Sequence, residues 1–410
     1  MSSSSLATGG PSPAVRDSPS PELVLDGRSA EDGEPIRVRI ADGVIAAIER
    51  LDGDGGSRWI SPGWLDIQVN GFDGHDPNAP GAGPDATSQM VNSLWRVGVS
   101  ASCPTICTES EAHILSCLRA VADACDADRL IAESVVGIHV EGPHIATEDG
   151  PRGAHALRHV RQPDIDEYRR WQDAARGRIR IITLSPEYDE SNAYIEAIVA
   201  DGVVASIGHT AATSDQIRAA VDAGASWSTH LGNGAHAMIR RHPNYIWDQL
   251  AEDRLSAGFI FDGQHLPPAV MRTVIRAKGV ERSVLVSDAL YVAGLAPGTY
   301  QLPDGAAVEL QASGRLELHG TPYLAGAAAP LSVGLANAVR HAGVSLSDAN
   351  RMVTANPSRL LGLSSRAGHD SLRVGSTANL TVFEVASNGF DLDVLRTVVA
   401  GRVVHEIDAA

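Results

Sequence analysis

The chain has 410 residues, of which 43% are hydrophobic, so it can bury one large core and a second, smaller one, because single domains rarely exceed about 250 to 300 residues. A formal net charge of −17 without any basic stretch makes a nucleic-acid partner unexpected. No apolar run approaches the roughly 18 residues that cross a bilayer, and residues 1–21 are rich in Ser and Pro without an apolar secretory segment. We therefore expect a cytoplasmic protein with a disordered leader over residues 1–21 and no membrane partner.

Both ends of the chain have the pattern of β-strands. Short strand-like runs broken by turns occupy residues 22–61, and strand-like runs return at 378–383 and 394–404. The simplest arrangement pairs the two chain ends with each other. We expect residues 22–61 and 369–410 to form one small β-sandwich domain, beside a main domain of residues 62–368.

The middle of the chain alternates apolar strand-like runs with helical stretches. Residues 213–223, for example, begin with a Thr-x-x-Gln capping box and end at Gly224. Such alternation indicates parallel strands covered by helices, and eight strands close a (β/α)₈ TIM barrel of the α/β class. The expected strands are 64–69, 99–107, 135–141, 179–184, 203–209, 225–230, 257–262 and 284–288.

The segment after the eighth expected strand departs from this alternation. Residues 297–320 form a turn-rich insert with strand-like pieces, and two helices are expected at 330–341 and 347–361. Another helix, which starts at Pro267-Pro268 and runs to Lys278, precedes the eighth strand.

Polar residues that could bind a metal stand where four of the expected strands end. These residues are Glu141, His209, His230 and Asp288. Taken singly, each is explained about as well, or better, by packing, capping or ion pairing. In a barrel, however, the carboxyl ends of the strands share one mouth, so the four side chains would converge there. Two imidazoles and a carboxylate, with a second carboxylate as base, are typical of a catalytic site for Zn²⁺ or a similar ion.

Cysteine and lysine usage excludes two other kinds of metal site. Cys103, Cys107, Cys117 and Cys125 have no C-x-x-C spacing, so we expect buried thiols in a reducing compartment rather than a structural zinc site. Lys278 is the only lysine of the chain, and it lies in an expected helix rather than at a strand end. A carboxylated lysine bridging two metal ions is therefore not expected.

Several short segments, taken in order, resemble the N-acetylglucosamine-6-phosphate deacetylases of the amidohydrolase superfamily. The resemblance runs from about Glu22 to the C-terminus. Its segments are Pro62-Gly-Trp-Leu-Asp-Ile-Gln-Val-Asn-Gly71, His139-Val-Glu-Gly-Pro143, Gly208-His-Thr-Ala-Ala-Thr213, Thr229-His-Leu231, Asp262-Gly-Gln-His265, Val286-Ser-Asp-Ala289, Thr354-Ala-Asn-Pro357 and Gly375-Ser-Thr-Ala-Asn-Leu380.

The resemblance assigns roles to particular residues. It implies that Glu141, His209 and His230 bind the metal, and that Asp288 is the general acid/base that acts on a metal-activated water. It also implies that His155, His265 and Asn233 contact the sugar, with His155 placed to polarise the acetamide carbonyl.

Two further expectations follow from the resemblance. Many amidohydrolases carry His-x-His after the first strand and hold two metals, whereas this chain reads Gln68-Val69-Asn70, so we expect one divalent ion, Zn²⁺ above others. A homodimer is implied by the family alone.

The segment after His230 differs from the family pattern. It reads Gly232-Asn-Gly-Ala-His-Ala-Met-Ile-Arg-Arg-His-Pro243, in which Arg240 or Arg241 either grips a phosphate or is solvated surface. The leading hypothesis is hydrolysis of N-acetyl-D-glucosamine 6-phosphate to D-glucosamine 6-phosphate and acetate. One alternative is a metal-dependent deacetylase of another N-acetyl amino sugar or of an N-acyl amino acid. A non-enzyme alternative is an inactive homologue that binds metal or sugar.

Overall fold

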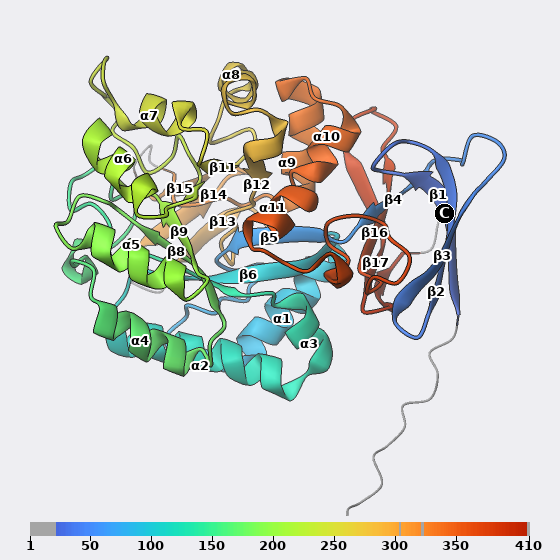
Figure 1. Ribbon diagram of the computed structural model, residues 1–410, viewed down its shortest axis with the longest axis horizontal. Coiled ribbons are helices and arrows are strands. Elements are labelled where there is room, and N and C mark those ends of the chain that lie inside the picture. The colour runs from blue at the N-terminus through green and yellow to red at the C-terminus, as the bar shows by residue number, and fades with distance from the viewer. Residues whose placement is uncertain (1–21, 303–304, 321–323, 408–410) are drawn as a thin grey trace, which may run out of the picture.

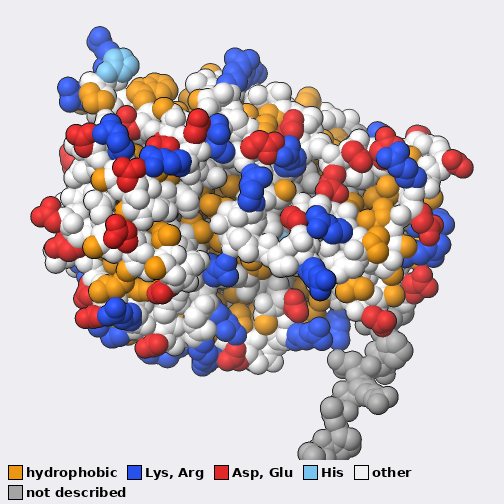
Figure 2. All heavy atoms as spheres, in the orientation of Figure 1, with side chains coloured by type: hydrophobic (Ala, Val, Ile, Leu, Met, Phe, Trp, Pro, Cys, Tyr) orange, Lys and Arg blue, Asp and Glu red, His pale blue; other side chains and the backbone are white. Residues whose placement is uncertain are grey.

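The computed structural model describes residues 22–302, 305–320 and 324–407. The expected leader over residues 1–21 lies outside these ranges. Figure 1 shows strands enclosed by helices in the larger part of the molecule, with a sheet built from both chain ends at one side. Acidic and basic side chains are interspersed over the face drawn in Figure 2.

Eight parallel strands form the barrel, which confirms the predicted fold class. The first and last strands are joined by the Asp288 amide, which donates to the Gln68 carbonyl at 2.9 Å, and by the Asn70 amide, which donates to the Ala289 carbonyl at 2.9 Å. The strands are β5 (Trp64–Val69), β6 (Val99–Cys107), β7 (Ile138–Glu141), β8 (Ile179–Leu184), β9 (Val204–Ile207), β10 (Trp227–Ser228), β11 (Ser256–Phe259) and β12 (Ser283–Leu285).

The barrel strands are buried on both faces, as parallel strands covered by helices must be. All residues of β5 are buried. Leu65 and Ile67 belong to a cluster that includes Cys103, Ile181 and Trp227 from other barrel strands, whereas Trp64 belongs to the larger cluster that includes the helices. The barrel interior is therefore a packed core, and ligands are confined to its ends.

Helices cover the barrel in the expected alternation. They are α1 (Pro84–Arg96), α2 (Glu111–Ala127), α3 (Arg129–Ser134), α4 (Ile165–Ala174), α5 (Ser191–Ala200), α6 (Ser214–Asp222), α7 (Tyr245–Ala251), α8 (Pro268–Lys278), α9 (Leu331–Asn337), α10 (Leu346–Arg351) and α11 (Ala355–Leu360). Short 3₁₀-helices lie at Leu157–His159, Val280–Arg282 and Ser365–Ala367, and a short π-helix at Ala338–Ala342 follows α9. The predicted capping box is present at the start of α6, where Thr213 and Gln216 bond each other's backbone amides.

Two helices, α10 and α11, occupy the segment where one helix was expected over residues 347–361. The prediction of one continuous helix was therefore wrong. Pro357 has no amide hydrogen for a bond to the turn before it, and its ring would clash with the carbonyl four residues earlier in a continuous helix. The chain instead breaks at Met352–Thr354, which leaves Pro357 in the first turn of α11.

A seven-stranded sheet contains strands from both chain ends, as predicted. Its order is β18-β17-β16-β4-β1-β2-β3, with β1 (Leu23–Ser29), β2 (Pro35–Ala41), β3 (Val44–Arg50), β4 (Arg58–Pro62), β16 (Leu380–Val385), β17 (Leu392–Val399) and β18 (Arg402–Glu406). The sheet curls back on itself, because Val44 at its edge forms a bridge with Thr377, just before β16. The domain boundaries at residues 61/62 and 368/369 stay a prediction.

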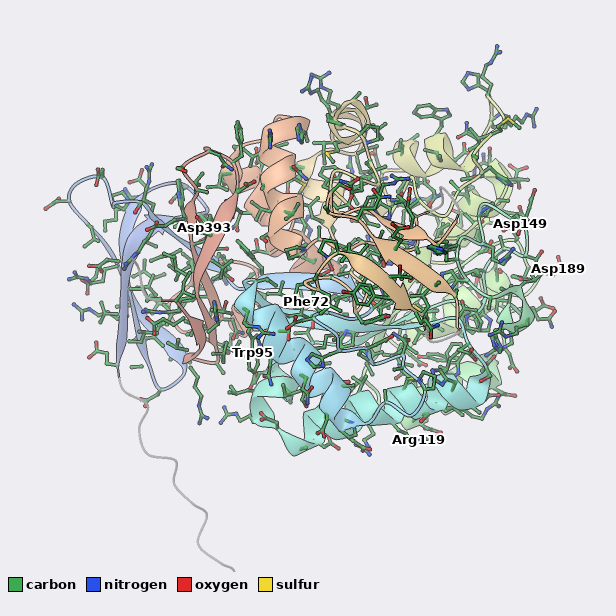
Figure 3. The ribbon with its side chains drawn as sticks, turned by 180° about the vertical axis from the view of Figure 1, so that it is seen from behind. Phe72, Trp95, Arg119, Asp149, Asp189 and Asp393 are labelled. Carbon is green, nitrogen blue, oxygen red and sulfur yellow. The ribbon has the colours of Figure 1, made fainter. Side chains whose placement is uncertain are left out.

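Two other contacts shape the barrel's surroundings. Thr381 and Thr397 of the seven-stranded sheet donate hydroxyl bonds of 2.7 Å to the carbonyls of Gly98 and Trp95, which fixes the sheet against α1 and β6. The predicted insert forms an antiparallel sheet of β13 (Gly298–Gln301), β14 (Ala307–Leu310) and β15 (Leu316–Leu318). Seen from behind in Figure 3, this sheet lies across the barrel strands.

Candidate active site

A cavity opens at the carboxyl ends of the barrel strands. Residues that end or follow six of the strands line it, namely Asn70, Cys107, Glu141, His209, His230 and Asp288. The segments around the three-stranded sheet add an apolar wall that includes Leu302 and Leu324. The convergence predicted for Glu141, both histidines and Asp288 is therefore present.

Glu141, His209 and His230 form a compact group at the base of this cavity. The Glu141 Oε1 atom lies 3.2 Å from His209 Nε2 and 2.9 Å from His230 Nε2, and the two imidazole nitrogens are 3.1 Å apart. His155 joins the group from a loop, with its Nε2 atom 3.3 Å from His209 Nε2. The ligand atoms of Glu141, His155 and His209 all lie within 4.8 Å of one another.

The side chains of His209, His230 and Asp288 reach the cavity because the backbone leaves each strand before these residues. His209, His230 and Asp288 have φ angles of 49°, 26° and 49°, in the left-handed region that interrupts a strand ladder. The strands consequently end at Ile207, Ser228 and Leu285, two or three residues before the expected ends. Such unfavourable backbone conformations are concentrated at functional sites.

The group fits a divalent cation. Zinc bonds of about 2.0 to 2.1 Å in tetrahedral geometry place two ligand atoms roughly 3.3 Å apart, close to the separations here. His209 Nδ1 lies 2.9 Å from the Pro151 carbonyl, a contact that holds the ring hydrogen on Nδ1 and leaves the Nε2 lone pair facing Glu141. The His209 electron pair and the Glu141 carboxylate face each other at 3.2 Å, which favours a positive charge between them.

The ionisation of the group reflects the same contacts. Burial alone would raise the pKa of Glu141, but the neighbouring imidazoles of His209 and His230 outweigh it and hold the pKa well below its usual value. Burial lowers the pKa of His155 to about 3, so this imidazole is neutral near pH 7.

Asp288 is held by two amides that follow the first barrel strand. Asn70 Nδ2 donates to Asp288 Oδ1 at 2.8 Å, and Gln68 Nε2 donates to the same oxygen at 3.2 Å and to Glu141 Oε1 at 3.1 Å. Burial, followed by the charge of Glu141, raises the pKa of Asp288 to about 6. A carboxylate with a pKa near neutrality suits proton transfer in both directions.

The remaining predicted contact residues divide into two sets. Asn233 and His265 line the cavity with His155. His265 Nδ1 lies 2.8 Å from Asp262 Oδ2, which directs its other nitrogen away from Asp262. Arg240 and Arg241 are exposed and do not line the cavity, because the segment that carries them projects from the molecule just before α7 (Figure 1). Their phosphate contact stays a prediction.

Lys278 takes no part in the cavity, as predicted. Its side chain is buried at the end of α8, where Nζ donates at 2.7 Å to the carbonyls of Gln249 and Glu252. Burial lowers its pKa to about 8. A lysine with this structural role is not available as a ligand bridge.

Sequence reasoning missed some contacts around Asp288. Gln68 and Asn70 entered the sequence argument only as replacements for a His-x-His pair, yet their amides hold the Asp288 carboxylate. Their position at the end of the first strand could have indicated that they face the active site. Cys107 was expected to be buried, but it is half-buried and lines the cavity, whereas Cys103, Cys117 and Cys125 are buried. Burial raises the pKa of the Cys107 thiol.

Comparisons with known proteins agree with this fold and site. The model of the amidohydrolase family matches residues 59–404. Human N-acetylglucosamine-6-phosphate deacetylase is 32% identical over 372 residues, which is 87% of this chain and 86% of that protein. An N-acetylgalactosamine-6-phosphate deacetylase of Escherichia coli O157:H7 is 30% identical over 351 residues, 85% of this chain and 90% of that protein.

Solved structures give the same result. The crystal structure of N-acetyl-D-glucosamine-6-phosphate deacetylase from Mycobacterium smegmatis superimposes with a TM-score of 0.83 at 30% identity, covering 93% of this chain and all of that one (100%). The chain therefore belongs to the amidohydrolase family and is a hydrolytic enzyme, as predicted. Its relatives are deacetylases of amino-sugar phosphates, which confirms the resemblance. Among the described residues, no helix is long and apolar enough to cross a membrane.

Proposed function

We propose that this enzyme hydrolyses N-acetyl-D-glucosamine 6-phosphate to D-glucosamine 6-phosphate and acetate. The observation that carries the proposal is the convergence of Glu141, His209 and His230 with the amide-held carboxylate of Asp288 in one cavity. The deacetylase activity of relatives that match most of the chain supports the substrate.

The proposed chemistry divides between a metal and Asp288. Glu141, His209 and His230 would hold one divalent ion, which we propose to be Zn²⁺, and which would supply Lewis-acid activation of a water and of the acetamide carbonyl. Asp288 takes a proton from the attacking water and delivers it to the leaving amine. Its pKa, raised to about 6 by burial, leaves the carboxylate mostly ionised near pH 7 and ready to accept that proton.

Other side chains orient the substrate. His155, neutral near pH 7, donates a hydrogen bond to the carbonyl oxygen as negative charge develops on it, a contribution typically of about 3 kcal/mol per donor. Asn233 and His265 line the same cavity and contact the sugar in this proposal.

A second candidate function concerns the sugar and its phosphate. Relatives from Escherichia coli O157:H7 and a Shewanella strain are N-acetylgalactosamine-6-phosphate deacetylases at 30% and 32% identity, similar to the glucosamine enzymes. In addition, no Lys or Arg occurs among the described residues that line the cavity. These observations favour another N-acetyl amino sugar as the alternative substrate, ahead of an N-acyl amino acid. A site that only binds metal or sugar has no use for the carboxylate of Asp288, which argues against an inactive homologue.

The test is acetate release by zinc-loaded protein from three substrates in parallel. These are N-acetyl-D-glucosamine 6-phosphate, N-acetyl-D-galactosamine 6-phosphate and unphosphorylated N-acetyl-D-glucosamine. We expect the highest kcat/KM with the first. If kcat/KM is higher with N-acetyl-D-galactosamine 6-phosphate or with unphosphorylated N-acetyl-D-glucosamine, that sugar becomes the assigned substrate. If none of the three sugars is hydrolysed, amino-sugar deacetylation is refuted.

Two further properties belong to the same proposal. We place the enzyme in the cytoplasm. We also propose that it is a homodimer. Two large apolar side chains support the dimer: Met238, in the projecting segment before α7, is 92% exposed, and Trp247, in α7, is 51% exposed. Large apolar side chains gathered at one edge suit a contact between two copies.

A further inference from the structure

One side chain clamps the ends of the first two barrel strands together. Asn78 Nδ2 donates to the carbonyl of Asn70 at 3.2 Å and to that of Thr105 at 2.9 Å, and Asn78 Oδ1 accepts from the Cys107 amide at 2.9 Å. Its amide therefore bonds three backbone groups on two segments. This clamp connects the backbones of Asn70 and Cys107 through one side chain.

The side chains of Cys107 and Asn70 are in contact beside this clamp. The Cys107 thiol donates to Asn70 Oδ1 at 2.9 Å, and Asn70 Nδ2 donates to Asp288 Oδ1 at 2.8 Å. The three side chains form one directed chain from thiol to amide to carboxylate. It begins on β6, passes through the end of β5 and ends after β12.

The direction of this chain is set at both ends, by the Asp288 carboxylate that accepts and by the thiol that donates. The two ends of an asparagine amide have nearly the same shape, so the surroundings decide which end faces a given neighbour. A donor at Cys107 favours the orientation that turns the Asn70 NH₂ group to Asp288. In the reverse orientation Asn70 Oδ1 would face the Asp288 carboxylate, oxygen against oxygen, and the bond would be lost.

We propose that Cys107 is a positioning residue for Asp288, acting by fixing the Asn70 amide so that Asp288 Oδ1 is occupied and its other oxygen is left for proton transfer. The inference rests on the proposed function for its kinetic effect, but the thiol–amide bond itself does not. A hydroxyl at position 107 would serve as well, because it is also a donor, whereas a methyl group would not.

The first test compares Cys107→Ala with Cys107→Ser. We expect kcat to fall by about tenfold in Cys107→Ala with KM nearly unchanged, since one oriented bond to a charged group is lost. Cys107→Ser should recover kcat to within about threefold of the wild type. Cys103→Ala is the matched control, because Cys103 lies on the same strand but is buried in the barrel interior. Equal losses in the Ala and Ser variants overturn the proposal.

The second test asks whether Cys107 acts through Asn70. In a double-mutant cycle with Asn70→Leu, which removes the amide, the further change Cys107→Ala should have no additional effect on kcat. Additive losses would mean that Cys107 acts by another route and would overturn the inference.

A third measurement is independent of activity. The S–H stretching band of Cys107, obtained as the Raman difference between the wild type and Cys107→Ser, should have the lowered frequency of a donating thiol. It should shift to the frequency of a free thiol in Asn70→Leu, while the zinc content of both proteins stays the same. A free-thiol band in the wild type overturns the inference even if the enzyme is active. A bonded band in a protein that hydrolyses none of the three sugars refutes only the proposed substrate.

Discussion

Asp288 combines a raised pKa with a carboxylate oxygen held by Asn70 and Gln68, which together suit a group that must accept and return a proton. Replacing Asp288 by Asn removes the proton acceptor but preserves the shape of the side chain. We expect kcat for deacetylation to fall by roughly 10²- to 10⁴-fold, with KM changed little and zinc content unchanged. Steady-state kinetics and elemental analysis of the purified variant measure both quantities. Asp253→Asn, at an exposed carboxylate paired with Arg282, is the control.

An Asp288→Asn enzyme with wild-type kcat would exclude Asp288 as the general acid/base. Loss of zinc together with activity would instead assign it to metal binding.

His369 makes the stability of the protein depend on pH. It is buried at the base of the barrel, with Nδ1 3.5 Å from the Gly63 carbonyl and Nε2 3.2 Å from the Asn379 amide nitrogen. Burial lowers its pKa to about 4 from the usual 6.5. Below pH 6.5 the unfolded chain therefore binds a proton that the folded protein excludes, so the His369 contribution to stability is present above pH 6.5 and is lost as the pH falls toward 4.

The loss should reach about 3 kcal/mol near pH 4, since each pKa unit corresponds to about 1.4 kcal/mol. His369→Gln retains one donor and one acceptor but cannot be protonated, so its free energy of unfolding should decline less over this range. Urea unfolding of both proteins between pH 4.5 and 8 compares the two slopes. Parallel slopes would show that folding does not lower the pKa of His369.

The sequence predicted the place of a side chain where that side chain follows its own strand. Glu141, His209, His230 and Asp288 each end an apolar run, and a barrel brings such ends together. The contact of Arg240 and Arg241 with a phosphate could not be derived in this way, because a loop has no periodicity that fixes its direction. Those side chains are exposed on a projecting segment.

At the scale of single elements, Gly334 offers a stabilising substitution. It lies in the middle of α9 with a right-handed helical backbone, and an added Cβ would meet only the Cβ of Phe261, at an ordinary 3.9 Å. Gly334→Ala should raise the free energy of unfolding by about 0.5 to 1 kcal/mol, because alanine loses less backbone entropy than glycine on forming a helix. Thermal or urea unfolding measures the change.

Substitution of Gly208, which lies between β9 and His209, should destabilise the protein. An added Cβ would lie 2.7 Å from Thr183 Cγ2 in β8 and 2.8 Å from Thr229 Cβ, just after β10. Gly208→Ala should therefore destabilise the protein by about 1 to 3 kcal/mol and reduce activity through displacement of His209. A stabilising Gly208→Ala, or a destabilising Gly334→Ala, would contradict the packing described around these two glycines.

The elements themselves were predicted well from periodicity, and their ends less well. All eight barrel strands were expected, but β9, β10, β11 and β12 end two or three residues early. After β9, β10 and β12 a site residue with a left-handed backbone interrupts the ladder. The single helix expected over 347–361 was wrong because Pro357 interrupts it. The helix break and the early ends of β9, β10 and β12 come from the backbone conformation of particular residues, which an apolar pattern does not encode.

For the molecule as a whole, metal removal should lower both stability and activity. A cation held by Glu141, His209 and His230 binds the folded state only, and at one hundred times its dissociation constant it stabilises that state by about 2.7 kcal/mol. Dialysis against a chelator should lower Tm by about 3 to 4 °C, and added Zn²⁺ should restore it.

Glu141→Gln is the control for the chelation experiment, because its Tm should respond little to either treatment. An unchanged Tm in the chelated wild type would indicate that this group holds no tightly bound ion.

The sequence by itself determined the barrel and the identity of the residues at its mouth, because apolar alternation and the polar residues that end each strand are local signals. Only the tertiary structure decided which side chains touch. Asn70 and Asp288 are 218 positions apart and meet because the last strand closes against the first, and Cys107 reaches Asn70 across 37 positions. The curl of the seven-stranded sheet and the position of the arginine-bearing loop were decided in the same way, since contacts between distant segments depend on chain closure and packing that no local pattern records.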